Sequence, residues 1–243
     1  MKKVLSSFGW ILLLLPLVSV AGARTALNTI SLNAFDEQTR EVANFSGVAS
    51  SGAFDVFIKI GSKESLKLEG DGEILDRVET PVEDGILHIR MKKGTNRINM
   101  NFKKIKVYIT AKKLNNLVVS GSGNINVEDK LKADDFSATV SGSGNISADL
   151  AATRLKAVVS GSGKIIASGS AKQSEVVVSG SGHFNGKNFN TDSADAKVSG
   201  SGHISIQADD TLNAAVSGSG NISYSGNAKV NMQKSGSGSI TRI

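Results

Sequence analysis

Apolar and polar residues alternate in short runs along the first part of the chain. The clearest runs are residues 53–60, 65–70, 85–91 and 104–110, and clusters of Gly, Asp or Lys separate them. Alternation of this kind is typical of β-strands that bury one face. We therefore expect four strands here, and the segment SSGAFDV at 50–56 resembles a degenerate copy of the motif that fills the rest of the chain.

That motif is SGSG, and it returns at nearly even spacing. Successive copies are separated by 21, 19, 19, 20, 18 and 18 residues. A flexible linker would have no fixed neighbours, whereas a valine precedes every copy except the last, and Ile or Phe stands two places after each copy. Such periodicity is typical of solenoid proteins. The copies begin at Ser120, Ser141, Ser160, Ser179, Ser199, Ser217 and Ser235.

The repeat predicts an all-β protein, a right-handed parallel β-helix with about seven SGSG-containing coils and an irregular β-rich N-terminal part. One unit of about 20 residues cannot enclose a core, but stacked units can, with strands of successive coils pairing in parallel at about 4.8 Å. The glycine density and the period of two exclude a helical solenoid. A left-handed helix of hexapeptides would explain steps of 18 residues but not steps of 19 to 21.

The glycines of the motif indicate a place where side chains do not fit. If the chain stays extended through SGSG, both glycines face inward, as where two walls of a coil approach closely. Glycine also lets a strand turn a corner. The polar segments at 128–135 and 149–153 fit the second corner of a coil, and their variable length explains the uneven step.

Residues 1–23 have the layout of a secretory signal peptide, with Lys2 and Lys3 before an apolar run and small residues at 21–23. The alternative, an uncleaved anchor, needs about 20 apolar residues. We expect an exported protein, periplasmic or at the cell surface, with no transmembrane segment after signal removal. Residues 24–115 then form a β-rich N-terminal region, either first coils or a cap, and residues 116–243 form the SGSG β-helix. The chain has no Cys, so burial and hydrogen bonds must stabilise it.

Three features together resemble the head GIN domain family. They are the recurrent V-S-G-S-G-x-I units, the segment SSGAFDVFI and the segment V-x-D-G-I-L-H-I at 82–89, all behind a signal peptide. The likeness covers about residues 43–243. Members of this family are described as auto-transporter adhesins. The resemblance implies a secreted or surface-exposed bacterial β-helix without an established catalytic activity.

Equivalent positions of stacked coils should form rows, which we call ladders. The outward Ser120 and Ser122 begin two of them, and a third follows the motif. As a binding surface these rows would form regular hydrogen bonds with glycan or a cell-surface protein. The alternative is that Ser and Gly simply fit a tight corner, where hydroxyls satisfy backbone groups. The third row, the polar ladder, contains Asn124, Asn145, Lys164, His183, His203, Asn221 and Ser239.

His183 and His203 are neighbours in the polar ladder, about 5 Å apart if the coils stack as expected. Two imidazoles can hold a transition metal. However, no Cys, Asp or Glu in the ladder completes a tetrahedral set. We therefore predict no metal and no cofactor.

The positive charge of the chain is concentrated in one segment. The formal net charge is +6, and residues 90–113 contain nine Lys or Arg residues and no acid. Lys103, Lys104 and Lys106 lie within it and could bind an acidic polysaccharide or an anionic membrane surface. The alternative is that lysines protect a solvent edge from strand addition. Export and an aromatic content of 5% argue against nucleic acid as a partner.

The sequence favours a non-enzymatic protein, an adhesin or cell-envelope scaffold. Right-handed β-helices also include polysaccharide lyases and hydrolases, which gather an acid pair, or a metal with a base, on one face. We see no acid cluster recurring at ladder-equivalent positions, so a polysaccharide-degrading enzyme is the alternative. Self-association of coils end to end is a third possibility, because the last coil near residues 235–243 leaves an open edge.

Overall fold

The computed structural model describes residues 36–94 and 105–243. The predicted signal peptide, Lys103 and Lys104 lie outside the described residues. Within these two ranges no helix has the length and apolar character needed to cross a membrane.

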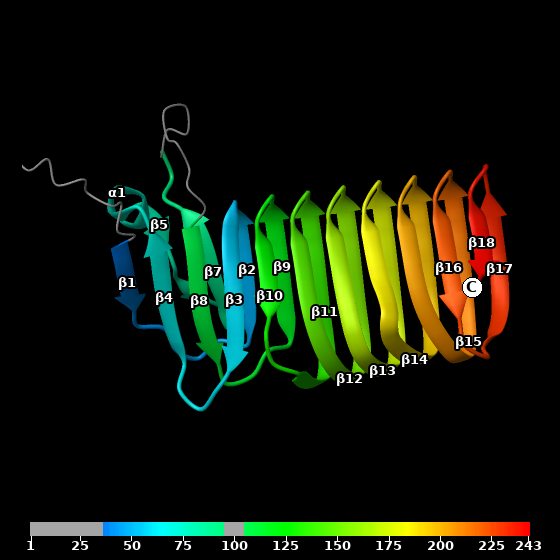
Figure 1. Ribbon diagram of the computed structural model, residues 1–243, viewed down its shortest axis with the longest axis horizontal. Helices are drawn as coiled ribbons and strands as arrows, with labels where there is room; N and C mark the ends of the chain where they lie inside the picture. Colours follow the sequence, from blue (N-terminus) through cyan, green and yellow to red (C-terminus); the bar gives the residue numbers. More distant parts are fainter. Residues whose placement is uncertain (1–35, 95–104) are drawn as a thin grey trace, which may run out of the picture. The chain divides into compact units, whose positions relative to one another are not determined.

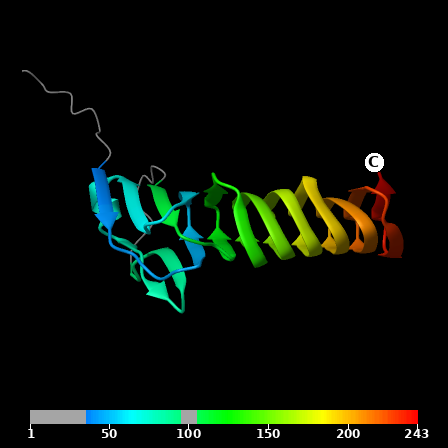
Figure 2. The ribbon, with the colours of Figure 1, turned by 90° about the horizontal axis from the view of Figure 1, so that it is seen from below.

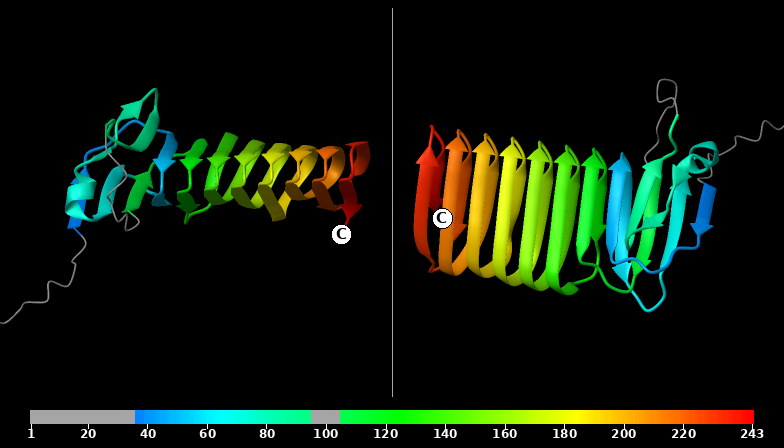
Figure 3. Two further views of the ribbon diagram at one scale, coloured as in Figure 1. Left: turned by 90° about the horizontal axis from the view of Figure 1, so that it is seen from above. Right: turned by 180° about the vertical axis from the view of Figure 1, so that it is seen from behind.

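The C-terminal half is a parallel β-solenoid, as the repeat predicts. Its strands stack side by side in sequence order (Figure 1), and the view from behind in Figure 3 shows the same stacking on the other side. Strands of successive coils pair in parallel. The strands are β9 (Asn116–Gly121), β10 (Asn124–Val127), β11 (Leu131–Gly142), β12 (Asn145–Gly161), β13 (Lys164–Gly180), β14 (His183–Gly200), β15 (His203–Gly218), β16 (Asn221–Ser225), β17 (Lys229–Ser235) and β18 (Ser239–Arg242).

Every SGSG copy forms one sharp corner of a coil. The register pairs the first serine and first glycine of each copy with those of the next, for example Ser141 with Ser160 and Gly142 with Gly161. The carbonyl of Gly142 accepts hydrogen bonds from the backbone amides of Ser162 and Gly163, both at 2.9 Å. The corners are therefore joined directly from coil to coil.

The two glycines of a copy are required for different reasons. The chain does not stay extended through the motif: the first glycine turns it, with φ of +112° at Gly200, a conformation that other residues rarely adopt. The second glycine is buried without positive φ. A Cβ on Gly202 would lie 2.5 Å from Val178 Cγ1 and 2.7 Å from the carbonyl oxygen of Gly182. A Cβ on the first glycine would also clash, since on Gly200 it would lie 2.7 Å from the carbonyl oxygen of Gly180, but this glycine is only partly buried. The second glycine is the buried, inward position without room that the sequence predicted.

From β12 to β15 the second corner is a bend within a continuous strand, whereas residues 128–130 separate β10 from β11 and residues 226–228 separate β16 from β17. The polar segment 149–153 lies inside β12 and pairs along most of its length with β13. Figure 2 shows these curved ends of the coils from below. Register shifts occur here in β14 and β15, and they accommodate the extra residues of the longer coils.

Each coil therefore has two halves with the core between them. We call the outer surface of the strands that follow SGSG the post-motif face, and that of the strands that lead into SGSG the pre-motif face. The valine before each corner lies in the core, and its exposed fraction is at most 2% from Val119 to Val216. The isoleucine or phenylalanine after each corner is buried to the same extent, up to Ile222.

The N-terminal region is β-rich, and part of it continues the coil. In it, β2 and β3 pair in parallel with β9 and β10, and Gly52 lies opposite Gly121, so SSG at 50–52 occupies the place of an eighth motif. The four predicted strands are confirmed as β3, β4, β7 and β8. Its elements are β1 (Asp36–Arg40), β2 (Gly47–Gly52), β3 (Phe54–Ile60), β4 (Ser65–Gly70), α1 (Gly72–Leu75), β5 (Val78–Glu79), β6 (Val82–Glu83), β7 (Ile86–Met91) and β8 (Ile105–Ala111).

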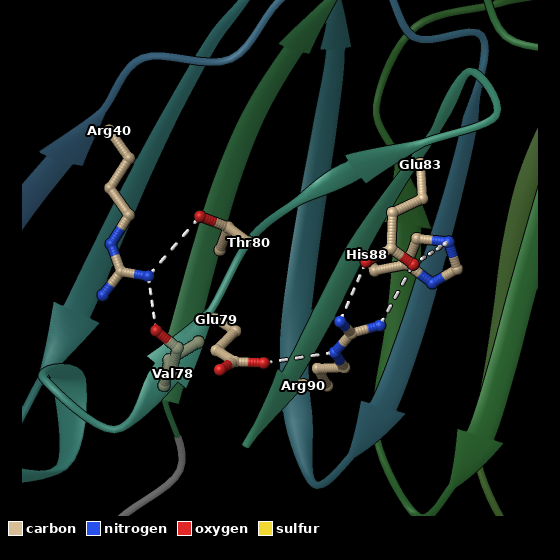
Figure 4. A network of polar contacts seen from close by, with 7 residues as sticks. All are labelled: Arg40, Val78, Glu79, Thr80, Glu83, His88 and Arg90. Atoms are coloured by element: carbon tan, nitrogen blue, oxygen red, sulfur yellow. Dashed lines mark hydrogen bonds and ion pairs between the residues drawn. The ribbon is translucent and has the colours of Figure 1, made fainter. Parts of the chain in front are cut away.

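Antiparallel pairing distinguishes this region from the coils. β4 pairs antiparallel with β1 and β8, and β5 and β6 pair antiparallel with β7. Arginine side chains connect these strands (Figure 4). Arg40 donates hydrogen bonds to the carbonyl oxygens of Val78 at 2.5 Å and Leu75 at 2.8 Å. Burial is the main cause that lowers the pKa of Arg40 below its ordinary value.

The last coil departs from the repeat at its inward positions. Lys234 stands where the previous coils have valine, opposite Val216, and it is exposed. A charged residue at an inward position of an edge strand hinders pairing with another strand.

Candidate functional site

The polar ladder lies on the post-motif face. The register places each of its members opposite the next, from Asn124 to Ser239. The N-terminal strands lengthen it, because Asp55 of β3 lies opposite Asn124 and Lys106 of β8 lies opposite Asp55. The sequence-predicted ladder and Lys106 of the basic segment therefore belong to one row.

The ends of the ladder are hydrogen-bonded within the row. Asn145 Nδ2 donates to Asn124 Oδ1 at 2.7 Å, and Asn124 Nδ2 donates to Asp55 Oδ1 at 2.6 Å. At the other end Ser239 Oγ donates to Asn221 Oδ1 at 2.7 Å. These side chains bind coil to coil, which is a structural role.

The centre of the ladder is different, because Lys164, His183 and His203 have no acidic partner among the described residues. The two imidazole rings have centroids 6.4 Å apart and are tilted by 54°. His203 Nε2 lies 3.0 Å from Ser205 Oγ. Burial lowers the pKa of His203, and the neighbouring His183 and the charge of Lys187 lower it further. The centre is thus the part of the ladder that contains a cation without an acid beside it in the described ranges.

The serines of the motif are exposed at the corners rather than on the post-motif face. Ser120 ends β9 on the pre-motif side, and Ser122 lies at the turn itself. In the described part of the chain neither hydroxyl has a hydrogen-bond partner. The corner therefore separates these serines from Asn124, which the sequence placed on the same surface.

The described part of the basic segment is largely paired with acids. Lys106 Nζ donates to Glu69 Oε1 at 3.0 Å, and this bond is the main cause that lowers the pKa of Glu69. Arg90 contacts Glu79 at 3.3 Å and Glu83 at 2.9 Å (Figure 4). Since ion pairing reduces the positive field, this segment contributes less to anion binding than its composition indicates.

A groove on the pre-motif face was not anticipated. It has a volume of about 710 Å³ and crosses the coils from β9 to β15 between two rows of side chains. Both rows can be found in the sequence four and six residues before each SGSG, whereas the predicted ladder consists of the residues that follow the motif. The minus-four row contains Asn116, Ser137, Lys156, Glu175, Asp195 and Asn213, and the minus-six row contains Asp135, Arg154, Gln173, Ser193 and Thr211.

The groove corrects the expectation that no acids occupy equivalent positions. Glu175 and Asp195 lie opposite one another on neighbouring coils, four residues before their respective motifs. Lys156 Nζ lies 3.2 Å from Glu175 Oε2, and Asn213 Nδ2 donates to Asp195 Oδ1 at 2.9 Å. Across residues 36–94 and 105–243, no group of three or more His, Cys, Asp or Glu side chains is arranged to hold a metal ion.

Solved structures share this fold. A "putative adhesin" from Bacteroides fragilis has a TM-score of 0.79 and 25% identity, over 86% of this chain and 97% of its own. A "putative lipid binding protein" from Parabacteroides distasonis has a TM-score of 0.72 and 24% identity, over 87% and 98%. A "putative adhesin" from Parabacteroides merdae has a TM-score of 0.65 and 20% identity, over 87% and 97%.

The sequence itself identifies the family. No curated protein matches the chain. The family model "Putative auto-transporter adhesin, head GIN domain" matches residues 44–228, which include both the N-terminal strands and most of the coils. This chain therefore belongs to the head GIN domain family.

Proposed function

We propose that this protein is an exported, non-enzymatic adhesion module, at the cell surface or in the periplasm, that binds an anionic glycan through the centre of the polar ladder. The observation that carries the proposal is the cluster of Lys164, His183 and His203, with Lys187 beside it and no acidic partner among the described residues. The description of the family as adhesins supports a binding role.

The coil geometry suits a polymer better than a single small anion. Lys164, His183 and His203 come from three successive coils, so their spacing along the solenoid is about 4.8 Å per coil. Carboxylates or sulfates at regular intervals along a glycan would meet one donor after another. Hydrogen bonds between charged partners are stronger than neutral ones, and those on an exposed face weaken as salt increases.

The partner class follows from the same surface. An acidic polysaccharide supplies anionic groups without requiring aromatic platforms, which nucleic acids use for stacking. A cell-surface protein with an acidic loop would offer fewer charges in register with the coils. We therefore favour glycan over protein as the partner.

The test is binding of the protein from residue 24 onward to polygalacturonate, measured by surface plasmon resonance. The double variant Lys164→Glu with Lys187→Glu should weaken binding at least about tenfold, because each reversed charge repels the polymer. The matched control, Lys197→Glu with Lys229→Glu, makes the same charge change on the pre-motif side and should bind within about twofold of the parent. Equal losses in both double variants would show nonspecific charge attraction and contradict the proposed site.

One observation favours a second candidate function. Glu175 and Asp195 lie opposite one another in the groove, and glycoside hydrolases act through two carboxylates on one face. If the alternative holds, incubation with linear polysaccharides releases reducing ends, and Glu175→Gln abolishes the release. We expect no release, because Lys156 and Asn213 already engage these carboxylates.

A further inference from the structure

The groove on the pre-motif face has no role in the proposed function, because it lies on the opposite side of the core from the polar ladder. Its volume of about 710 Å³ is within the range of sites that bind small molecules. It is long rather than deep, since residues of six strands from successive coils line it. A ligand that fills it must extend along the stack of coils.

The walls of the groove alternate donors and acceptors along that direction. In the minus-six row Arg154 donates to both carboxylate oxygens of Asp135, from Nε to Oδ1 and from Nη2 to Oδ2 at 2.6 Å, and this is the main cause that lowers the pKa of Asp135. Further along, Thr211 Oγ1 donates to Ser193 Oγ at 2.8 Å. Carboxylate, amide, guanidinium and hydroxyl groups thus line both sides.

The charge of the walls is nearly balanced. Two cations, Arg154 and Lys156, lie among three acids, Asp135, Glu175 and Asp195. Such a surface does not attract polyanions. It does offer many partly used acceptors and donors to an uncharged polyhydroxyl compound, because each carboxylate oxygen can accept more than one hydrogen bond.

The residues between the two rows belong to the core. Phe136, Leu155 and Ala194 alternate with the wall residues along their strands, so their side chains point inward, and at most 4% of each is exposed. Ser174 occupies the same inward position, and its buried hydroxyl donates to Thr191 Oγ1 at 3.0 Å, so it is already satisfied. The surface that meets a ligand is therefore formed by the polar side chains of the minus-four and minus-six rows, which complement the hydroxyls at the edges of a sugar ring.

We propose that this groove is a second binding site, which takes a neutral linear glycan lying along the stack of coils. The rise of one coil, about 4.8 Å, is close to the length of one sugar unit in an extended chain, so successive sugars meet equivalent side chains. The minus-four and minus-six rows bind the hydroxyls on either side of the glycan.

The experiment is isothermal titration calorimetry of the protein from residue 24 onward. The probes are β-1,4-linked hexasaccharides of glucose, xylose, mannose and N-acetylglucosamine. At least one should bind with a dissociation constant of about 1 mM or lower. Since the ligand carries no charge, the affinity should be the same at about 50 mM and about 500 mM salt.

Two tryptophan variants locate the site. Gln173 is exposed in the middle of the minus-six row, and Gln173→Trp should fill the groove and reduce affinity at least about tenfold. Asn188 is equally exposed, on β14 outside the groove, and Asn188→Trp should bind as the parent does. Both variants should keep the β-sheet circular dichroism spectrum of the parent.

The outcomes separate this site from the polar ladder. Lys164→Glu with Lys187→Glu should leave hexasaccharide binding unchanged, so failure of the proposed function does not affect this inference. Absence of binding by all four hexasaccharides overturns the proposal. So does a Gln173→Trp variant that binds as well as the parent, or an affinity that falls with salt.

Discussion

The two outer faces of the same coils differ in chemistry although they are built from one repeat. On the post-motif face the row after each corner is hydrogen-bonded at its ends and positively charged at its centre, where Lys164, His183 and His203 meet. On the pre-motif face two rows of mixed, nearly balanced charge line a groove. The difference shows that the repeat fixes the inside of each coil and leaves the outside free to vary.

The physical reason is that inward and corner positions are constrained by neighbours above and below. Val140 and Val159 stack in the core, and the second glycine of each motif lies against the backbone of the previous coil. Outward side chains meet only solvent and their ladder neighbours, so many residue types fit. Two binding surfaces can therefore change independently on one scaffold.

The largest expected effect comes from a substitution that destabilises the coils on which both faces depend. Gly202→Ala forces a Cβ to 2.5 Å from Val178 Cγ1 and 2.7 Å from the Gly182 carbonyl oxygen, and this overpacking should cost about 1–3 kcal/mol of unfolding free energy. Urea denaturation measures the loss. Binding to both glycans should decrease together.

The matched control is Gly85→Asn, at a turn where an added Cβ meets nothing within 4 Å and φ is +73°. Asparagine tolerates this left-handed conformation, so the cost should stay below about 1 kcal/mol. A corner variant as stable as this control would contradict the constraint that we assign to the second glycine.

A change of pH should alter ligand binding on the post-motif face but not on the pre-motif face. His203 has a lowered pKa, so it is neutral at pH 7 and becomes protonated only as the pH falls below its ordinary value of about 6.5. The titratable groups that face it are His183 and Lys187 on β14, while Ser205 and Asn221 are not titratable. Polygalacturonate binding should therefore strengthen several-fold between pH 8 and about pH 5.5.

The same shift predicts the opposite trend for stability. The unfolded chain binds a proton at His203 before the folded chain does, so unfolding free energy is lost as the pH falls from about 6.5 through the lowered pKa. His203→Asn should reduce both trends. Hexasaccharide binding should not change over this range, because the groove lining contains no histidine among the described residues. A pH response of equal size on both faces would contradict this assignment.

The smallest effect concerns the amide part of the ladder. Asn145→Ala removes the bond to Asn124 Oδ1 and should cost about 0.5–1.5 kcal/mol of unfolding free energy, without weakening either glycan. Thermal denaturation and the two binding assays check this result. If Asn145→Ala weakens polygalacturonate binding as much as the lysine reversals do, the amides belong to the binding site.

Much of the fold was predictable, because the apolar residues and glycines that the interior of each coil requires recur at a nearly fixed interval in the sequence. The valine before SGSG and the isoleucine after it predicted the core. The likeness of SSGAFDV at 50–56 to the motif indicated a degenerate copy, and β2 and β3 form a coil there, although the sequence left open whether the region was first coils or a cap. The turn at the first glycine was not resolved by the period-two pattern, since positive φ leaves no periodic signal. The antiparallel pairing of strands β4 to β7 could not be predicted either, because nothing in their short alternating runs specifies which strand pairs with which.

The candidate sites were predictable only in part. Stacking of His183 on His203 follows from the step of 20 residues, and the structure confirms that they are neighbours. The pairing of Lys106 with Glu69 does not follow, because it depends on β4 lying antiparallel to β8. The groove could not be predicted from a repeated residue, because the positions that line it, four and six residues before the motif, are occupied by acids, bases, amides and hydroxyls in different coils.

The most direct test of the central claim, that the two faces bind independently, is a sequential titration on one sample. The protein from residue 24 onward is saturated with oligogalacturonate, and the neutral hexasaccharide that binds best is then titrated into the complex by calorimetry. We predict one hexasaccharide per chain with an affinity within about twofold of that of the free protein. Loss of hexasaccharide binding in the saturated complex would contradict the account, because it would place both ligands on one surface.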